Sequence, residues 1–320
     1  MVKMKRILAL TLTAFALTAS AQIFNVGAVE PLAVPADSPY TMVVAMSHAG
    51  DFALLTTDTY DGIARYDFAT RRTTIVTEAH GAGIAPALSS DDAVVAYREV
   101  SYDATHRRYS AARAANLRTG EVTEVMAPSR DLCAVAVDGN VATAIMGADR
   151  ISPRRVISRG DTDRVSDPRR ISAQPVLAID RGQLTITVGD NTRVLSPCGT
   201  EGTSYIWPSL SPDGTRVMFY LVGSGIYTCD LNGGNLQFVS DLRAPVWYDD
   251  DTIIAMNDVD GHDTQESSTL VAVRLSTGEQ QVLCGGNDLI AMYPQASDKA
   301  QTVAFTTAAG APYLLHLTKP

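Results

Sequence analysis

The sequence predicts an all-β fold, a β-propeller built of four-stranded antiparallel blades. A short pattern of strand, turn and strand recurs at intervals of 33 to 49 residues, and roughly 40 residues is the length of one propeller blade. Asp-Gly, Asn-Gly and Thr-Gly pairs, which favour hairpin turns, separate runs rich in β-branched and aromatic residues. After residue 21, we find no segment with the period of a four-turn amphipathic helix.

The repeat is clearest in Pro208–Gly214, which reads PSLSPDG and is followed by the β-rich run RVMFYLV. A lone four-stranded sheet cannot bury both of its faces, so several copies around an axis stabilise one another. Seven copies predict seven blades, and because the copy at Cys133 is the weakest, six blades is the alternative. The anchor residues of the copies are Val44, Pro86, Cys133, Pro175, Pro208, Pro245 and Pro294.

The last copy, Pro294–Pro320, has room for only three strands. The segment Gln22–Val34 precedes the first copy and is apolar enough to form a strand. We expect this segment to supply the missing outer strand of the last blade. Such a closure would remove the exposed strand edge that an open ring leaves.

Residues 1–21 have the features of a secretory signal peptide. Lys3, Lys5 and Arg6 precede a short apolar run, and Ala19-Ser-Ala21 fits the pattern of a cleavage site. We therefore expect cleavage near Ala21, a periplasmic or secreted location, and one propeller domain over residues 22–320. No other segment is apolar for long enough to predict a membrane span.

The charge and the cysteines exclude some classes of protein. Without residues 1–21 the chain keeps 23 Lys+Arg against 35 Asp+Glu, a formal net charge of −12, which argues against a nucleic-acid partner. The cysteine spacing matches no metal knuckle, so we expect core or strand positions and leave their pairing open. Oligomeric state has no signature in the sequence. The four cysteines are Cys133, Cys198, Cys229 and Cys284.

The segment Pro208–Gly214 resembles the TolB-like propeller repeat, P-x-W-S-P-D-G. Leu210 stands where the repeat usually has Trp, whereas Trp247 occupies that slot after Pro245 and is expected in the core. The resemblance implies a ring of four-stranded blades, commonly with a role in protein or ligand binding. Enzymes with this propeller carry an added domain such as a G-x-S-x-G hydrolase, a motif absent from this sequence. Enzyme activity stays open, with a non-enzymatic role favoured.

In a four-stranded blade, the turns between strands one and two and between three and four lie on one face. The remaining links lie on the opposite face, and they include the long segments of this chain. Because functional residues tend to lie on long loops held by a rigid scaffold, we expect the binding site on that opposite face. The long segments are Arg98–Tyr109, Met146–Arg155, Asn257–Ser268 and Gly285–Met292.

The first long segment carries Tyr102, His106, Arg107 and Arg108. Aromatic residues together with arginines are typical of the residues that contribute most binding energy at protein interfaces. A solvated loop with no ligand is the simpler alternative.

Five further residues are candidates for ligand binding. Trp207 and Tyr293 each precede an anchor proline, which places them near the channel mouth; there they would stack on a sugar or a peptide side chain, or merely line the channel. Asp258, Asp260 and His262 form part of a D-x-D-G-x-D pattern that resembles a calcium loop, although His262 stands where an oxygen ligand would be useful. An ordinary acidic hairpin is the alternative, so no cofactor is predicted and calcium is kept only as a hypothesis.

The sequence thus favours an exported propeller scaffold that binds a protein or a peptide in a bacterial envelope. The alternative is a glycan-active enzyme, or a sensor of a small ligand, with its site at the mouth of the central channel. We assign no catalytic residue, because no Ser-His-Asp arrangement can be chosen among so many candidates.

Overall fold

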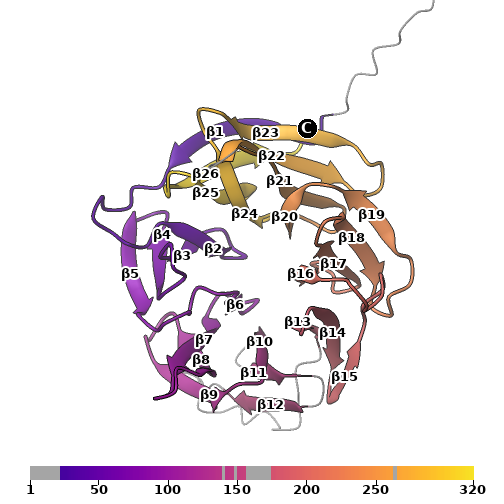
Figure 1. The fold of residues 1–320 in the computed structure, drawn as a ribbon. Coiled ribbons are helices and arrows are strands. Elements are labelled where there is room, and N and C mark those ends of the chain that lie inside the picture. The colour runs from indigo at the N-terminus through magenta and orange to yellow at the C-terminus, as the bar shows by residue number, and fades with distance from the viewer. Residues whose placement is uncertain (1–21, 139–140, 148–149, 156–173, 262–264) are drawn as a thin grey trace, which may run out of the picture.

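The computed structural model describes residues 22–320 except 139–140, 148–149, 156–173 and 262–264. The predicted signal peptide, residues 1–21, lies outside the described residues. Within those ranges the regular elements are all β-strands, and they form seven antiparallel sheets arranged in a ring (Figure 1). The predicted β-propeller is confirmed.

Five of the sheets have four strands, as predicted for a blade. In each of them the first strand lies next to the central opening and the fourth lies at the periphery, and β1 is the peripheral strand of the last sheet (Figure 1). The strands are β2 (Met42–Met46), β3 (Phe52–Thr56), β4 (Ile63–Asp67) and β5 (Arg72–Thr77); β6 (Ala87–Leu88), β7 (Val94–Tyr102), β8 (Arg108–Asn116) and β9 (Val122–Ser129); β16 (Tyr205–Leu210), β17 (Arg216–Leu221), β18 (Gly225–Asp230) and β19 (Gln237–Ser240); β20 (Arg243–Trp247), β21 (Thr252–Asp260), β22 (Gln265–Arg274) and β23 (Gln280–Gly286); and β24 (Ala291–Ser297), β25 (Thr302–Thr307), β26 (Pro312–Thr318) and β1 (Asn25–Pro31).

The other two sheets have three strands each in the described residues. They arise from the repeat copies at Cys133 and Pro175, so the prediction of seven four-stranded blades is wrong for this sector of the ring. Their strands are β10 (Leu132–Asp138), β11 (Val141–Met146) and β12 (Arg150–Arg155), followed by β13 (Val176–Asp180), β14 (Gln183–Val188) and β15 (Asn191–Val194).

Strand β13 runs in the opposite direction to its neighbours β10 and β16. Gly182, just after its end, accepts a hydrogen bond of 3.0 Å from the backbone N–H of Tyr205, where β16 begins. Asp180 shares one cavity with Asp131 and Cys133, at the beginning of β10. The expectation that every first-to-second turn lies on one face is therefore wrong here. A sheet of three strands ends on the face opposite to its start, and a second such sheet restores the direction.

The anchor positions of the repeat are β-bulges in the innermost strands. Ala85, Trp207, Ala244 and Tyr293 each precede an anchor proline and have φ values of 48°, 51°, 46° and 51°. In β16, β20 and β24 the pairing with the second strand changes register at this point. Because a bulge leaves one residue unpaired and redirects its side chain, the residue before the proline is held at the wall of the central channel.

The serine three positions after the anchor closes the first turn of several sheets. Ser47 Oγ accepts hydrogen bonds from the backbone N–H groups of Asp51 and Phe52, at 2.9 and 3.0 Å. Ser89 and Ser211 make equivalent bonds in their own turns. These hydroxyls are buried, and they satisfy N–H groups that the tight turn would otherwise leave unpaired.

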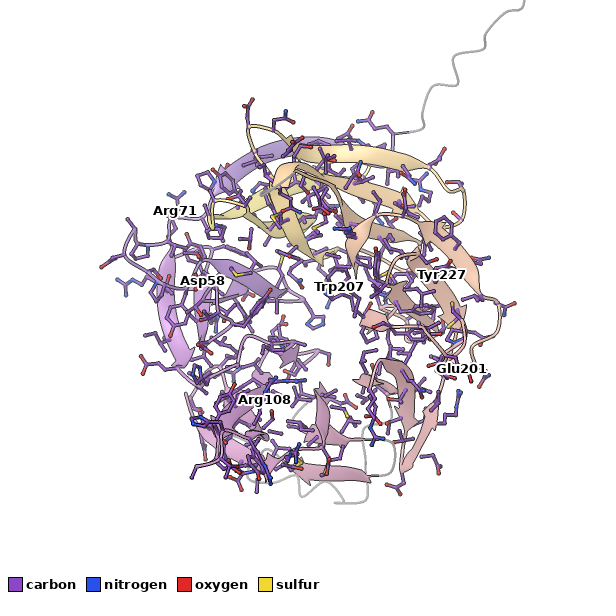
Figure 2. The ribbon with its side chains drawn as sticks, in the orientation of Figure 1. Asp58, Arg71, Arg108, Glu201, Trp207 and Tyr227 are labelled. Atoms are coloured by element: carbon purple, nitrogen blue, oxygen red, sulfur yellow. The ribbon has the colours of Figure 1, made fainter. Side chains whose placement is uncertain are left out.

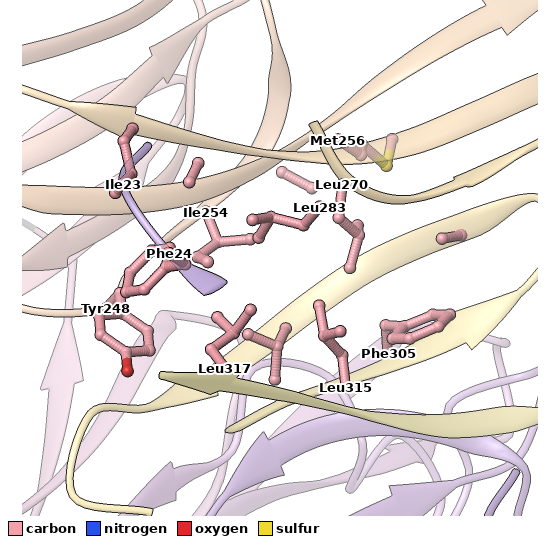
Figure 3. Close-up of a cluster of buried hydrophobic side chains, with 14 residues drawn as sticks. Ile23, Phe24, Tyr248, Ile254, Met256, Leu270, Leu283, Phe305, Leu315 and Leu317 are labelled. Atoms are coloured by element: carbon pink, nitrogen blue, oxygen red, sulfur yellow. The ribbon is translucent and has the colours of Figure 1, made fainter. Parts of the chain in front are cut away.

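The N-terminal segment packs between the last two sheets (Figure 3). Strand β1 pairs antiparallel with β26, and the side chains of Ile23 and Phe24 join a buried cluster with residues of β20–β26. The Phe24 ring lies 4.7 Å from that of Tyr248, edge to face. Gln281 Oε1 accepts hydrogen bonds of 2.8 Å from both backbone N–H groups, Ile23 and Phe24. Truncating a buried phenylalanine of this kind costs about 3–5 kcal/mol.

All four cysteines are free thiols in this structure. Cys133, Cys229 and Cys284 lie in strands, whereas Cys198 follows β15. Burial is the main cause that raises the pKa of Cys229 and of Cys284 to about 12. In the described part of the chain, no helix combines the length and the apolar character that a membrane crossing requires.

Candidate binding site at the channel mouth

The two faces of the ring carry different kinds of connection. We call turn face the face with the first turns of the regular sheets, such as 47–51 and 211–215, and loop face the face with the hairpin ends 57–62, 103–107 and 222–224. Trp207 and Tyr293 lie where innermost strands enter the ring from the loop face, and Figure 2 shows Trp207 at the inner rim.

The long segments of the loop face are mostly paired strand, which differs from the expected loops. Strand β7 extends to Tyr102 and β8 begins at Arg108, so only residues 103–107 form the turn. Likewise β21 and β22 stay paired as far as Asp260 and Gln265. Residues with high β-propensity such as Val100 continue the ladder, which satisfies backbone groups that a loop would leave to water.

Asp258 forms an ion pair with Arg243. Its carboxylate, whose side chain is 2% exposed, lies 2.8 Å from Nη1 of Arg243 and accepts a further hydrogen bond of 3.1 Å from Gln265 Nε2. Asp260 lies 3.4 Å from the same Arg243 nitrogen and stays exposed. The negative charge of Asp258 is the main cause that raises the pKa of Arg243.

A calcium ion would have to compete with Arg243 for these two carboxylates. No group of three or more His, Cys, Asp or Glu side chains is arranged to hold a metal ion in the described residues. His262, the third residue of the predicted loop, lies outside the described residues.

Aromatic side chains surround this ion pair. Burial raises the pKa of Tyr293, and electrostatic interactions with Tyr60 and Asp258 raise it further. Trp207 is 39% exposed, and its ring meets that of Tyr220 edge-on at 5.5 Å between centroids. Tyr220 in turn is a hydrogen-bond partner of Arg243.

The structure therefore brings three of the sequence candidates, Trp207, Asp258 and Tyr293, into one cluster that spans neighbouring sheets. We call it the mouth cluster. Its members are Trp207, Tyr220, Arg243, Asp258, Tyr293 and Tyr60.

Tyr102 and Arg108 belong to a different place on the loop face. Together with His80 and Asp61 they line a cavity of about 340 Å³ between the first two sheets. His80 Nδ1 lies 2.6 Å from Asp61 Oδ1. The N–H of Gly81 is the main cause that lowers the pKa of Asp61, and hydrogen bonds from His80 and Thr59 add to the effect.

His106 and Arg107 are not brought to either cluster. Both lie in the exposed turn 103–107, where His106 has a φ of 59°. Asp103 holds this turn by accepting hydrogen bonds from the backbone N–H groups of Thr105 and Arg107, at 2.7 and 3.0 Å. Their place in a tight turn explains both residues without a ligand.

The central channel itself contains a cavity of about 610 Å³. It is lined by residues of six innermost strands, β6, β10, β13, β16, β20 and β24, and by Arg98 of β7. Trp247, which was expected in the core, also lines this cavity, with the Arg216 guanidinium 5.4 Å from its ring centroid.

Arg98 is the lining residue that the sequence did not single out. It lies within the apolar run of β7 and reaches the next sheet, where its Nη2 donates to the backbone O of Cys133 at 3.0 Å. An arginine in the middle of such a run was the available signal, because burying a charged side chain is costly and calls for an explanation.

No family model matches the chain, and neither does any curated protein. Among solved structures, the β-propeller domain of Cps50 (Swd1) from Myceliophteria thermophila has a TM-score of 0.57 at 11% identity, over 90% of this chain and 100% of that one. A chain of a mitotic checkpoint complex gives 0.53 at 10% identity, over 98% of both chains. TolB from Acinetobacter baumannii gives 0.48 at 14% identity, over 88% of this chain and 66% of that one. The first two likenesses, with TM-scores above 0.5, agree with the predicted β-propeller and extend to the fold alone.

Proposed function

We propose that this chain is a binding protein that recognises a protein or peptide partner through the loop face. The observation that carries the proposal is the mouth cluster, in which Trp207 stays partly exposed beside tyrosines and an arginine. Tryptophan, tyrosine and arginine are the residues that most often dominate the energy of protein interfaces. A rigid ring of sheets holds them in place, so little conformational entropy is lost on binding.

We also propose that the protein acts in a bacterial envelope after export. The support is the signal-peptide pattern of residues 1–21. Fractionation of cells that produce the full chain tests this part: a processed protein in the periplasm or the medium is expected, and an unprocessed protein in the cytoplasm contradicts it.

The binding proposal is tested by affinity capture from an envelope extract with two matched variants. Trp207→Ala removes an aromatic side chain from the mouth cluster, whereas Phe238→Ala removes one that is 57% exposed on the peripheral strand β19. We expect the same captured protein with the wild type and with Phe238→Ala, and a clear loss with Trp207→Ala. Capture that is equal for all three proteins contradicts the proposal.

A second candidate is a glycan-active enzyme or a small-ligand sensor. The observation that favours it is the cavity in which Asp61 and His80 form a close pair beside Tyr102 and Arg108, because convergent ionisable groups in a hollow are the usual mark of such a site. Turnover or binding of an oligosaccharide that is abolished by His80→Ala would favour this candidate. Activity that is unchanged in this variant would exclude this cavity as its site.

For the ring itself, we propose that β1 closes it as the outer strand of the last sheet. The pairing of β1 with β26 and the burial of Phe24 support this proposal. If it is correct, Phe24→Ala lowers the free energy of unfolding by about 3–5 kcal/mol and promotes association through the freed edge of β26. An unchanged unfolding curve and a monomeric variant contradict the closure.

A further inference from the structure

The cavity in the central channel has apolar walls and one charged residue. Trp207, Ile206, Val246 and Trp247 contribute large apolar surfaces. Among the described residues that line it, Arg98 alone carries a charge. A mostly apolar hollow with a few polar groups is the usual form of a ligand site, and a volume of about 610 Å³ lies within the range of such sites.

Arg98 lacks an acidic partner among the described residues. Its Nη2 donates to the backbone O of Cys133 at 3.0 Å, and its Nε is buried without a hydrogen-bond partner. Burial lowers the pKa of Arg98, and the positive charge of Arg108 lowers it further. The guanidinium of Arg98 therefore has no anionic partner among the described residues, although the chain has a formal net charge of −9. A carboxylate would suit it, because the planar guanidinium can donate two parallel hydrogen bonds to the two oxygens of a carboxylate.

Two other residues in the cavity wall also have buried polar atoms without a hydrogen-bond partner among the described residues. Ser209 Oγ and Trp247 Nε1 are buried and have no hydrogen-bond partner among the described residues. Buried polar atoms without a partner are rare in folded proteins, and each calls for an explanation such as a missing ligand. Three residues with such atoms, Arg98, Ser209 and Trp247, line the same cavity, and each offers a donor. A ligand that accepts hydrogen bonds is the kind of group that would give these donors a partner.

We propose that this cavity binds the C-terminal residue of a peptide, with the α-carboxylate on Arg98 and the apolar side chain against Trp207 and Ile206. This inference rests on the proposed peptide-binding function and names the part of the partner that enters the channel. A sugar acid would supply the same carboxylate, but its ring hydroxyls would face walls that offer few polar side chains, which is unfavourable.

The intrinsic tryptophan fluorescence of the protein can be used to measure ligand binding in this cavity. Its only two tryptophans are Trp207 and Trp247, and both line the cavity, so intrinsic fluorescence follows its occupancy. N-acetylphenylalanine serves as the probe, its C-terminal amide removes the charge at almost the same shape, and glucuronate represents the sugar acids. We expect the wild type to bind N-acetylphenylalanine at least tenfold more tightly than the amide or glucuronate.

Two arginine substitutions locate the effect. Arg98→Met keeps a long apolar side chain but removes the donors, and it is expected to weaken N-acetylphenylalanine binding about tenfold or more, to the level of the amide. Arg118→Met makes the same change in the exposed turn 117–121 and is expected to leave the affinity unchanged. Arg98→Lys keeps the positive charge but loses the paired donors of the guanidinium, so its affinity for N-acetylphenylalanine should lie between those of the wild type and Arg98→Met.

Equal affinity for the acid and the amide in the wild type overturns the proposal, and this comparison does not depend on any variant folding. So does an Arg98→Met protein with native circular dichroism and undiminished affinity, or tighter Arg98-dependent binding of glucuronate than of N-acetylphenylalanine. If Trp207-dependent capture of a partner succeeds while acid and amide bind alike, the proposed function stands and this inference falls.

Discussion

On the turn face, side chains of one sheet hold the backbone of the next. Asp92 accepts hydrogen bonds from the N–H groups of His48 and Ala49, at 2.8 and 2.9 Å, and Asp250 accepts one from Asp213 at 2.8 Å. On the loop face, by contrast, Trp207 and Tyr102 stay 39% and 59% exposed. The comparison teaches that the recurring polar side chains of the turns serve the ring, whereas the loop face leaves large side chains accessible.

Of the two faces, the turn face is expected to show the larger effect on stability, and a pair of adjacent serines tests it. Ser89 is buried and its Oγ accepts hydrogen bonds from the backbone, whereas Ser90 is exposed. Ser89→Ala leaves buried N–H groups unpaired, so it should lower the free energy of unfolding by about 1–3 kcal/mol and the Tm by about 2–6 °C. Ser90→Ala is the matched control with almost no effect. Equal midpoints for the two variants in calorimetry would remove the structural role given to the turn serine.

A smaller effect is expected from the loop face. Trp207→Ala removes a partly exposed ring that meets Tyr220 edge-on, so we expect a loss of about 1 kcal/mol or less. Urea denaturation of Trp207→Ala beside Phe238→Ala measures this difference. A loss above about 3 kcal/mol would mean that Trp207 serves the core, and the contrast between the faces would fail.

The smallest effect concerns pH. Hydrogen bonding to its carboxylate lowers the folded-state pKa of Asp61, so the stability it contributes is present above its unfolded pKa, about 4, and is lost as the pH falls through the lower folded value. The advantage of the wild type over Asp61→Asn should therefore shrink below about pH 4. Asp58→Asn, in the same hairpin end, sets the baseline for this measurement. An advantage that stays constant from pH 6 to pH 2 contradicts the prediction.

The sequence was sufficient to predict the propeller and most of its regular sheets, because the anchor and the serine of the repeat have local physical roles. The copies at Cys133 and Pro175 carry Ala136 and Ala178 where four other copies carry the turn serine, and these are the copies that form three-stranded sheets. The Pro245 copy, which has Tyr248 at this position, still forms four strands. The reversed direction of β13 was not predictable, because its hairpin has the same pattern in either orientation.

The site was predictable only in part, for a similar reason. Trp207 and Tyr293 were found because each precedes an anchor proline, which is a local signal for the place where an innermost strand enters the ring. Arg98 was missed because its role depends on Cys133 in the next sheet, and such contacts have no signature within the strand that carries the arginine. His106 and Arg107 of the 103–107 turn lie apart from both clusters, and hydrogen bonds to Asp103 account for the conformation of this turn.

The central claim is that a partner binds the loop face and not the turn face, and photo-crosslinking tests it most directly. A benzoylphenylalanine placed at Trp207 or Tyr102 samples the loop face, and one placed at Thr277 or Asn232 samples exposed turns of the turn face. In cells that export the protein, we predict adducts of one defined mass from the first two positions and none from the others. Adducts from Thr277 and Asn232, with none from Trp207 and Tyr102, would contradict the account.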